Sequence, residues 1–455
     1  MDVERVLRSR RVVTPEGVRP ATVHLRDGLV VAIEGPDHGV EGVATLDVGD
    51  AVVMPGVVDS HVHVNEPGRT EWEGFETATR AAAAGGVTTI CDMPLNSLPV
   101  TTTPDAVARK AESAARAACV DYALWGGLVP ANARSLDALL DAGVPGCKCF
   151  LVHSGIDEFP NVTEEDLEIA MPVLARRGRV LLVHAELPGP IEALGPPAGD
   201  PRRYATWLAS RPRASENEAI ALMLRLAERT GCRVHIVHLS SSDALPALAE
   251  ARRRGVPVTV ETCPHYLTFT SEEIEDGRTE FKCAPPIRER ENRERLWEGL
   301  RDGTIDMVVS DHSPCTPGLK AREAGDYVAA WGGISSLQLL LPALWTGAKE
   351  RGFSLTDVAE WLCRRPAFLA GLDRRKGSLA PGHDADVVVW YPERDFRVDA
   401  EMIRHKHRLT PYAGRVLSGV VEKTFVRGQL VFDSAAGGDA LAAVSGERLL
   451  PGAGS

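Results

Sequence analysis

The chain has 455 residues, which is enough for two or three domains or for one large barrel with an appendage. Hydrophobic residues make up 44% and charged residues 25%, which excludes a wholly disordered chain, a fibrous protein and a disulfide-rich miniprotein. The 63 acidic and 51 basic side chains give a net charge of −12, which argues against nucleic acid or an anionic membrane as the main partner.

Targeting signals and disulfides are not expected. No run of about 18 apolar residues predicts a membrane-spanning helix. The first residues, from Met1 to Arg5, mix both charges and lack the apolar core of a signal peptide. Nine cysteines without a CxxC pair fit reduced thiols. Together these features predict a cytoplasmic protein with no membrane partner.

Both ends of the chain are predicted to be β-structure. Short apolar runs that are typical of strands lie at 11–14, 21–25, 29–33, 385–390, 420–426 and 429–432. The pairs Asp27-Gly28 and Arg427-Gly428 are turn signals between neighbouring runs. We therefore expect one small β-sandwich domain built from both termini.

This arrangement sets the expected domain boundaries. Residues 1–54 and 379–435 would form the small β domain, and residues 55–378 would form a larger domain inserted between its two parts. Residues 436–455 are rich in glycine, alanine and serine, so we expect a poorly ordered tail there.

The middle of the chain alternates apolar runs with helical patterns. Eight apolar runs lie at 52–64, 87–93, 120–128, 146–152, 179–184, 233–239, 256–263 and 305–310. Eight repeats of a strand followed by a helix are typical of an α/β fold of the (β/α)8, TIM-like barrel type. A doubly wound open sheet is the alternative, but no glycine-rich nucleotide-binding loop follows an early strand to favour it.

Several of the helices carry their own end signals. The helix expected at 73–84 is followed by Gly85-Gly86, and the helix expected at 163–177 by Gly178. The second of these opens with Thr163 and has Asp166 three residues later, which predicts a capping box. Ser215 and Glu218 predict another capping box ahead of a helix at 219–228.

Polar side chains stand at the ends of the predicted strands. His61 and His63 end the first strand, and residues two apart in a strand point to the same side. His184 ends the fifth strand, His238 the sixth and Asp311 the eighth. Barrel enzymes place their sites at this carboxyl end. Each histidine alone could be a buried structural residue, but the set predicts a metal site.

Lys148 lies inside the apolar run 146–152. Burial of an ammonium ion is costly, so burial lowers the pKa of the amine and makes it reactive. The neutral amine could take up carbon dioxide to form a carbamate, whose two oxygens can bridge two cations. The alternative is a lysine whose head reaches solvent at the barrel mouth.

Taken in chain order, these residues resemble the metal-binding set of the amidohydrolase superfamily. The set is His61-Val62-His63, Lys148, His184, His238 and Asp311. It is similar in particular to the cyclic-amide branch of allantoinases, hydantoinases and dihydroorotases. The resemblance implies two divalent ions, zinc or else cobalt, nickel or manganese, bridged by N6-carboxylated Lys148.

The resemblance also implies roles for the other residues. His61 and His63 would hold one ion with Asp311, and His184 and His238 would hold the other. Such a pair of ions would lower the pKa of a shared water, and the hydroxide would attack the ring carbonyl. Asp311 would act as the general base and then pass the proton to the leaving nitrogen.

Local strings distinguish the branches of this family. Asn65 stands where dihydroorotases place a carboxylate-binding arginine, and His153 stands where hydantoinases place a tyrosine. The strings at 66–74, 92–96, 148–155, 263–266, 283–288, 310–315 and 331–334 resemble those of allantoinases. The resemblance therefore implies opening of allantoin to allantoate in purine degradation. It also implies a homotetramer, with a dimer as the alternative. A hydantoinase or dihydropyrimidinase acting on another cyclic amide is the alternative, and a non-enzymatic scaffold is a remote one.

The substrate contacts are predicted separately, because a neutral polar ring needs hydrogen bonds from the cavity wall. The candidates are Asn96, Cys263, Ser313 and Gly332. Asn96 and Ser313 could instead stabilise turns, which both residue types do well. His153 and His265 could be hydrogen-bond donors behind the metal ligands.

Overall fold

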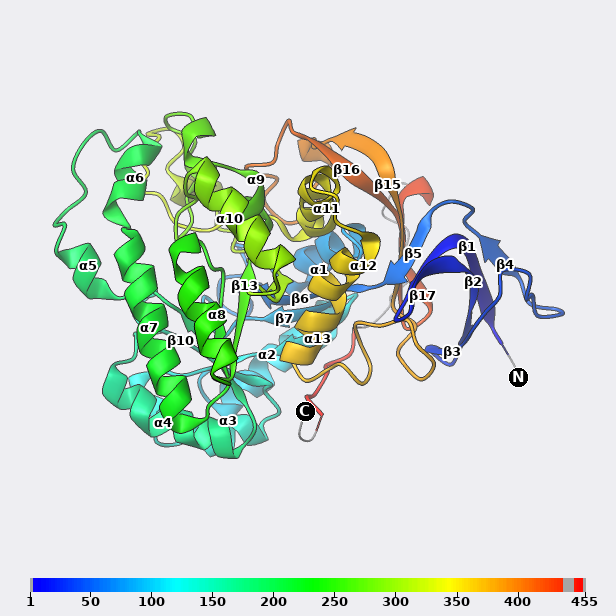
Figure 1. The fold of residues 1–455 in the computed structure, drawn as a ribbon, viewed down its shortest axis with the longest axis horizontal. Coiled ribbons are helices and arrows are strands. Elements are labelled where there is room, and N and C mark those ends of the chain that lie inside the picture. Colours follow the sequence, from blue (N-terminus) through cyan, green and yellow to red (C-terminus); the bar gives the residue numbers. More distant parts are fainter. Residues whose placement is uncertain (1–2, 437–445, 453–455) are drawn as a thin grey trace.

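The computed structural model describes residues 3–436 and 446–452 (Figure 1). It has an α/β fold in which a sheet made from both ends of the chain lies beside a larger body of parallel strands and covering helices. No helix in the described ranges is long and apolar enough to cross a bilayer. All nine cysteines lie in these ranges, and none is paired in a disulfide.

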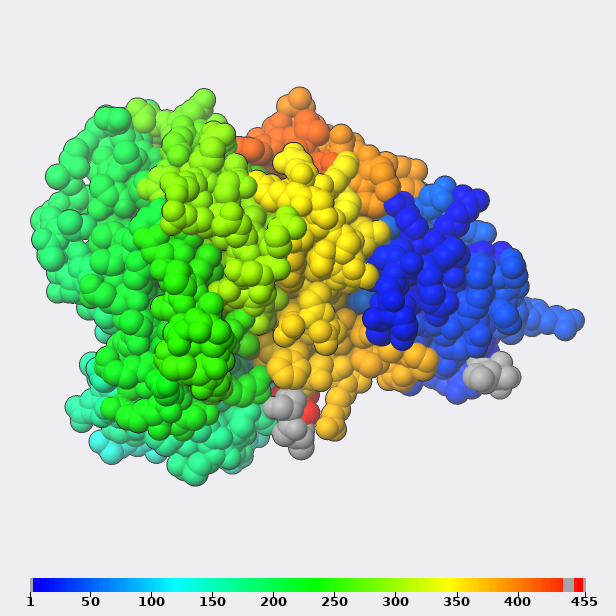
Figure 2. Space-filling model, in the orientation of Figure 1, coloured from blue at the N-terminus to red at the C-terminus, as the bar shows by residue number. Residues whose placement is uncertain are grey.

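The terminal sheet joins segments from opposite ends of the sequence. Its strands are β1 (Arg5–Thr14), β2 (Gly17–Arg26), β3 (Leu29–Glu34), β4 (Thr45–Asp47), β5 (Val52–Pro55), β15 (Val387–Arg397), β16 (Val416–Val426) and β17 (Gln429–Asp433). Their order is β17-β16-β15-β5-β1-β2-β3, and β4 pairs with β1. The two ends of the chain meet where β5 pairs antiparallel with β15. Figure 2 shows the same association as blue and orange segments packed at one end of the molecule.

The central strands are all paired in parallel. They are β6 (Val57–Val62), β7 (Val87–Asp92), β8 (Asp121–Leu124), β9 (Gly126–Gly127), β10 (Gly146–Phe150), β11 (Val180–His184), β12 (Val234–Ile236), β13 (Val258–Thr262) and β14 (Met307–Val308). One sheet runs β6-β7-β8 and the other β9-β10-β11-β12-β13-β14. The chain passes from β8 directly into β9, and a parallel bridge from Val62 to His312 joins β6 to the segment after β14.

Each of the eight apolar runs contains at least one of these strands, and the first run contains two. It divides at Gly56 into β5, which belongs to the terminal sheet, and β6. A Cβ atom on Gly56 would lie 2.2 Å from the Oγ1 atom of Thr88, so only glycine fits where the chain passes between the two sheets.

Helices surround the central strands (Figure 1). They are α1 (Phe75–Ala84), α2 (Pro104–Ala117), α3 (Leu136–Asp141), α4 (Glu164–Arg176), α5 (Pro188–Glu192), α6 (Tyr204–Ser210), α7 (Arg213–Thr230), α8 (Leu245–Arg253), α9 (Pro264–Thr268), α10 (Arg290–Arg301), α11 (Leu340–Glu350), α12 (Leu355–Ala359) and α13 (Arg365–Leu369). One large apolar core lies between these helices and the strands, and a smaller core lies within the terminal sheet.

The helix-end signals were confirmed at α1 and α4 but not at α7. Thr163 and Asp166 form the predicted capping box of α4, and α1 ends at Gly85. The capping box predicted at Ser215 was wrong, because α7 already begins at Arg213, directly after Pro212. The hydroxyl of Ser215 lies inside the helix and donates to the carbonyl of Leu187 at 2.7 Å.

Part of the expected tail is ordered against the central strands. The backbone of Leu449 donates to the carbonyl of Tyr122 in β8 at 2.7 Å, and Tyr122 donates to the carbonyl of Glu447 at 2.9 Å. The Leu449 side chain is buried. The expectation of a poorly ordered tail was therefore wrong for 446–452, because composition does not reveal backbone pairing with a distant strand. The rest of that prediction concerns 437–445 and 453–455, which lie outside the described residues.

Candidate metal centre

The six predicted ligands gather at the carboxyl ends of the central strands. His61 lies in β6, Lys148 in the middle of β10 and His184 at the end of β11; His63, His238 and Asp311 follow β6, β12 and β14. Parallel strands present their carboxyl ends on one side, so side chains far apart in the sequence meet there. All six are buried.

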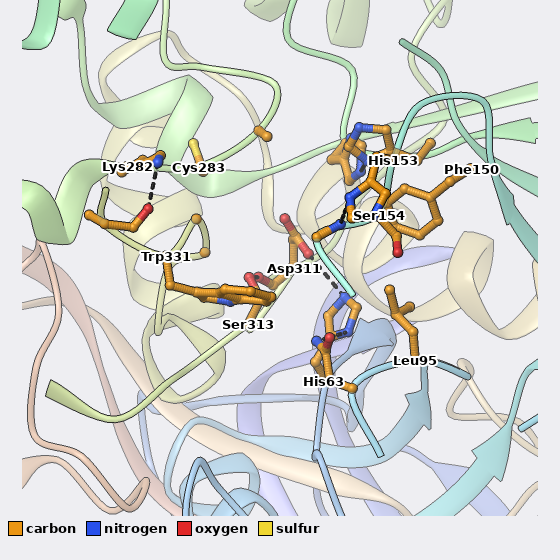
Figure 3. Close-up of a pocket in the computed structure, with 18 of the residues that line it drawn as sticks. His63, Leu95, Phe150, His153, Ser154, Lys282, Cys283, Asp311, Ser313 and Trp331 are labelled. Carbon is orange, nitrogen blue, oxygen red and sulfur yellow. Dashed lines mark hydrogen bonds and ion pairs between the residues drawn. The ribbon is translucent and has the colours of Figure 1, made fainter. Parts of the chain in front are cut away.

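The ligand atoms form two groups. Asp311 Oδ1 lies 3.2 Å from His61 Nε2 and 3.6 Å from His63 Nε2 (Figure 3). In the second group, Nδ1 of His184 lies 3.0 Å from Nε2 of His238. The two groups are neighbours, since the rings of His61 and His238 are 5.6 Å apart. The geometry therefore offers two adjacent positions at which a metal ion could be bound by nitrogen and oxygen atoms of these side chains.

Unusual backbone conformations accompany this cluster. His238, Asp311 and Asn96 have positive φ values of 39°, 45° and 71°, in the left-handed region that side chains other than glycine seldom adopt. Each such residue costs about 1–3 kcal/mol, and such residues concentrate at functional sites. The tight turns after β12 and β14 place His238 and Asp311 over the ends of the strands.

Burial sets the charge state of the ligands. It lowers the pKa of His61 to about 4 and the pKa values of His63 and His238 well below their usual range, so these imidazoles are neutral. A neutral imidazole has a lone pair to offer a metal ion. Burial also lowers the pKa of Lys148 to about 8, so a substantial fraction of this side chain is a neutral amine near physiological pH.

Two glutamates that the sequence analysis missed orient the histidines. Glu261 in β13 lies 2.6 Å from Nδ1 of His61, so the Nε2 atom of His61 faces the site. Glu186 lies 2.8 Å from Nε2 of His184, and Arg211 donates to Glu186. Carboxylates that fix the tautomer of a ligand histidine are typical of metal sites.

A signal for one glutamate was present in the sequence. Glu261 is an acidic residue inside the apolar run 256–263, which is the same kind of anomaly that singled out Lys148. Burial alone would raise the pKa of Glu261, but its contacts with His61 and His235 hold that pKa well below the usual range. Glu261 is therefore an anion placed between two imidazoles.

The donor set fits divalent ions. His184 Nδ1 and His238 Nε2 face one another, and Nδ1 of His238 is buried with no hydrogen-bond partner among the described residues. His61, His63 and Asp311 bring their ligand atoms within 4.8 Å of one another. Neutral imidazoles with a carboxylate suit zinc and the neighbouring transition metals.

A cavity of about 300 Å³ opens above the six ligands, which is large enough for a small cyclic substrate. Asn96, Ser313 and Gly332 line it, as the sequence analysis expected. Asn96 also lies 3.4 Å from Nδ1 of His63, and Ser313 donates to the backbone carbonyl of Asp311 at 2.9 Å. Both residues therefore combine a place in the wall with a contact to a ligand residue.

The structure places the other predicted residues differently with respect to the cavity. Cys263 and His265 are not part of the cavity wall and lie buried beside Asp311. The Cys263 side chain is therefore not a wall contact, and the roles predicted for the backbone around Cys263 and for His265 as a donor behind the ligands stay predictions. His153 lines the cavity but is largely exposed and bonds to Asp157. The sequence analysis missed the wall residues Trp207, Arg211 and Lys282, and it included Trp331 only as part of the string 331–334.

Comparison with known proteins adds the family context. Residues 52–431 match the model described as the amidohydrolase family. An allantoinase of Streptomyces avermitilis is 54% identical over 94% of this chain and 96% of its own. An allantoinase of Arabidopsis thaliana is 48% identical over 93% of this chain and 87% of its own.

Among solved structures, the L-hydantoinase (dihydropyrimidinase) of Arthrobacter aurescens is similar over the whole chain. It has a TM-score of 0.88 and 34% sequence identity, and the match covers 100% of this chain and 99% of that one. The similarity therefore extends over the terminal sheet as well as the central body.

Proposed function

The chain belongs to the amidohydrolase family, and we propose that it opens the hydantoin ring of allantoin by hydrolysis to give allantoate. The observation that carries the proposal is the convergence of four histidines, a lysine and an aspartate at the foot of one small cavity. The identity of about half the residues to allantoinases over almost the full length selects the substrate within the family.

We propose that the site holds two divalent ions, zinc in the first instance. His61, His63 and Asp311 would hold one ion and His184 and His238 the other, with N6-carboxylated Lys148 between them. When bound, such a centre supplies a Lewis acid for the ring carbonyl and lowers the pKa of a water. The neutral imidazoles and the accessible amine of Lys148 favour this assignment.

The protein's own residues then handle the proton and the substrate. Asp311 is the proposed proton acceptor, and its oxygen would deliver the proton to the leaving ring nitrogen. Asn96, Ser313 and Gly332 line the cavity and are the proposed contacts of the polar ring. The apolar side chains of Leu95 and Phe150 line the other side of the cavity (Figure 3).

The finer architecture is part of the proposal. The parallel bridge from Val62 to His312 favours a closed (β/α)8 barrel, and the terminal sheet favours a small β-sandwich domain at 1–54 and 379–435 around a barrel at 55–378. The homotetramer and the cytoplasmic location stay predictions. Light scattering of the purified protein would test the first.

The deciding experiment measures allantoin hydrolysis and bound metal in the same sample, prepared with zinc and bicarbonate. We expect allantoate formation with about two metal ions per chain, and loss of both after chelation. Lys148→Ala should lose metal and activity together. Unchanged metal content and activity in that variant would contradict the role of the lysine.

A second cyclic amide is the alternative, because the similar solved structure is a hydantoinase. Hydrolysis of 5-substituted hydantoins or dihydrouracil, with none of allantoin, would replace allantoin as the substrate while leaving the metal chemistry in place.

A further inference from the structure

The cavity above the ligands has two unlike sides. Figure 3 shows His63, Leu95 and Phe150 to one side of Asp311, and Lys282, Cys283 and Trp331 to the other. The first side presents apolar side chains beside the metal ligands. The second carries the ammonium group of Lys282, a cation that the hydrolysis itself does not require.

Lys282 is held in a defined position. Its Nζ atom lies 4.3 Å from the centre of the Trp207 ring and donates to the carbonyl of Val328 at 3.0 Å and to that of Ala330. Trp207 is fixed in turn, because its indole donates to the carbonyl of Cys283 at 3.1 Å. The ammonium has three N–H groups, and the described residues supply acceptors for two.

Resting on the proposed function, we propose that Lys282 is a specificity-determining residue that donates a hydrogen bond to the ureido carbonyl of allantoin. The reacting ring carbonyl must lie at the metal ligands beside Asp311, so the arm at the ring's tetrahedral carbon extends toward a wall of the cavity. An ammonium in a site shielded from water forms a strong bond to a carbonyl oxygen.

The same corner discriminates against other hydantoins. An apolar arm placed there would strip water from the ammonium and give it no acceptor in return. A site built around a buried donor rejects analogues that lack the matching acceptor more strongly than an apolar pocket rejects an extra group. Lys282 therefore favours a ureido arm over an alkyl or aryl arm.

Lys282 also supports the 328–333 loop, so a test must separate recognition from loop support. Lys320 provides the control, because it is buried, lies outside the cavity wall and donates to the carbonyls of Trp331, at 3.0 Å, and Gly333. Lys320 also donates to the backbone carbonyl of Lys282 at 3.3 Å. Lys320→Met therefore removes support from the same loop and from the Lys282 backbone, while the Lys282 side chain that makes the proposed substrate contact stays in place.

The experiment compares allantoin with unsubstituted hydantoin, which has the ring but no arm. Where the enzyme turns over hydantoin too slowly for kcat/KM to be measured, the inhibition constant of hydantoin, measured with allantoin as the substrate, is compared instead. We expect Lys282→Met to lower kcat/KM for allantoin about 10- to 100-fold, mainly through KM, and to change the hydantoin value by no more than about twofold. Lys282→Arg should restore most of the loss, and Lys320→Met should affect both compounds equally.

Equal losses for allantoin and hydantoin in Lys282→Met would overturn the inference and leave Lys282 as a loop support. Metal content and the urea midpoint of each variant establish that the compared proteins are folded and loaded. A metal-loaded wild-type enzyme that does not hydrolyse allantoin would instead overturn the proposed function, so the two failures are distinct.

Discussion

A buried lysine in the cavity wall makes substrate binding sensitive to pH. Burial, together with the nearby cations Lys320 and Arg211, lowers the pKa of Lys282 to about 8, and Asp326 opposes this shift. Below this pH the ammonium can donate a charge-assisted bond, and above it the neutral amine is a weaker donor. The proposed contact should therefore weaken as the pH rises through 8.

We predict that KM for allantoin rises above pH 8 relative to the inhibition constant of hydantoin. Allantoin and hydantoin have the same ring and bind at the same metal ligands. Titration of the ring or of the metal ligands therefore affects both constants alike and cancels in their ratio. In Lys282→Arg the side chain stays charged, and the ratio should stay flat between pH 7 and pH 9. A ratio that rises equally in the arginine variant would show that another group is responsible.

A second prediction at the residue scale concerns Glu261, which lies between two buried imidazoles. Glu261→Gln keeps the shape but removes the charge that orients His61 and raises its basicity. We expect metal affinity to fall about 10- to 100-fold, as is typical when such a partner is replaced. Competition with a chelator measures this directly.

Glu73→Gln is the matched control for this test. Glu73 is equally buried and also faces a histidine, His312, at 3.4 Å, but His312 is not a proposed ligand. Metal affinity should stay at the wild-type value in this variant. An equal loss in both variants would attribute the effect to general loosening of the fold.

At the scale of elements, close strand pairing fixes the position of Lys148. Gly146 pairs with Val180 across β10 and β11, and a Cβ atom on Gly146 would lie 2.2 Å from the Val180 carbonyl oxygen. An added methyl group must push the two strands apart, because the atom that it meets belongs to the backbone. Lys148 lies two residues further along the same strand.

Gly146→Ala should therefore destabilise the protein by about 1–3 kcal/mol, the usual cost of an overpacked core, and should reduce bound metal. Gly189→Ala is the control, since Gly189 lies in α5 and, outside its chain neighbours and its own helix, no heavy atom of the described residues lies within 4 Å of an added Cβ atom. That change should leave stability equal or slightly higher because alanine favours a helix. Urea unfolding and metal content distinguish the two variants.

The elements also show what local sequence could predict. Alternating apolar runs and capping signals identified the strands and the helix α4, because both depend on neighbours in the chain. The expected boundary at 54 already lies inside the first run, but the exact split at Gly56 depends on contact with Thr88, and the pairing of 446–452 depends on β8. No local pattern encodes such distant contacts, so these features could not be predicted.

The candidate site also combines residues that local sequence could predict with residues that depend on distant contacts. Strand ends and chain order were enough to select the six ligand candidates, which the structure brings together. Lys282 and Arg211 were missed because they come from segments without a recognisable pattern and meet the cavity only through tertiary packing. The contact predicted from the backbone around Cys263 stays a prediction, since the buried Cys263 side chain lies outside the cavity wall.

At the scale of the whole molecule, a buried cation joins three parts of the chain. Lys376 is fully buried and forms ion pairs with Asp121 of β8 at 2.5 Å and with Asp384 and Asp386, just before β15, at 2.8 Å. Asp121 also accepts a hydrogen bond from the backbone of Glu447 in the ordered end of the chain at 2.8 Å. The cluster thus connects the central strands, the terminal sheet and the C-terminal segment.

We predict that Lys376→Met is strongly destabilising, although methionine is similar in length and the site is closed to solvent. Removal of the shared cation takes one ionic partner from all three carboxylates, although Asp121 keeps Arg427 and Asp384 keeps Arg375. Loss of one partner from a buried ion pair typically costs about 3–5 kcal/mol. The exposed pair of Arg10 with Asp50 is the control, because solvent screens it and Arg10→Met should leave the urea midpoint unchanged. A small loss in Lys376→Met would mean that the carboxylates are protonated or hydrated in the folded protein, and that apolar packing, not this cluster, holds the three parts together.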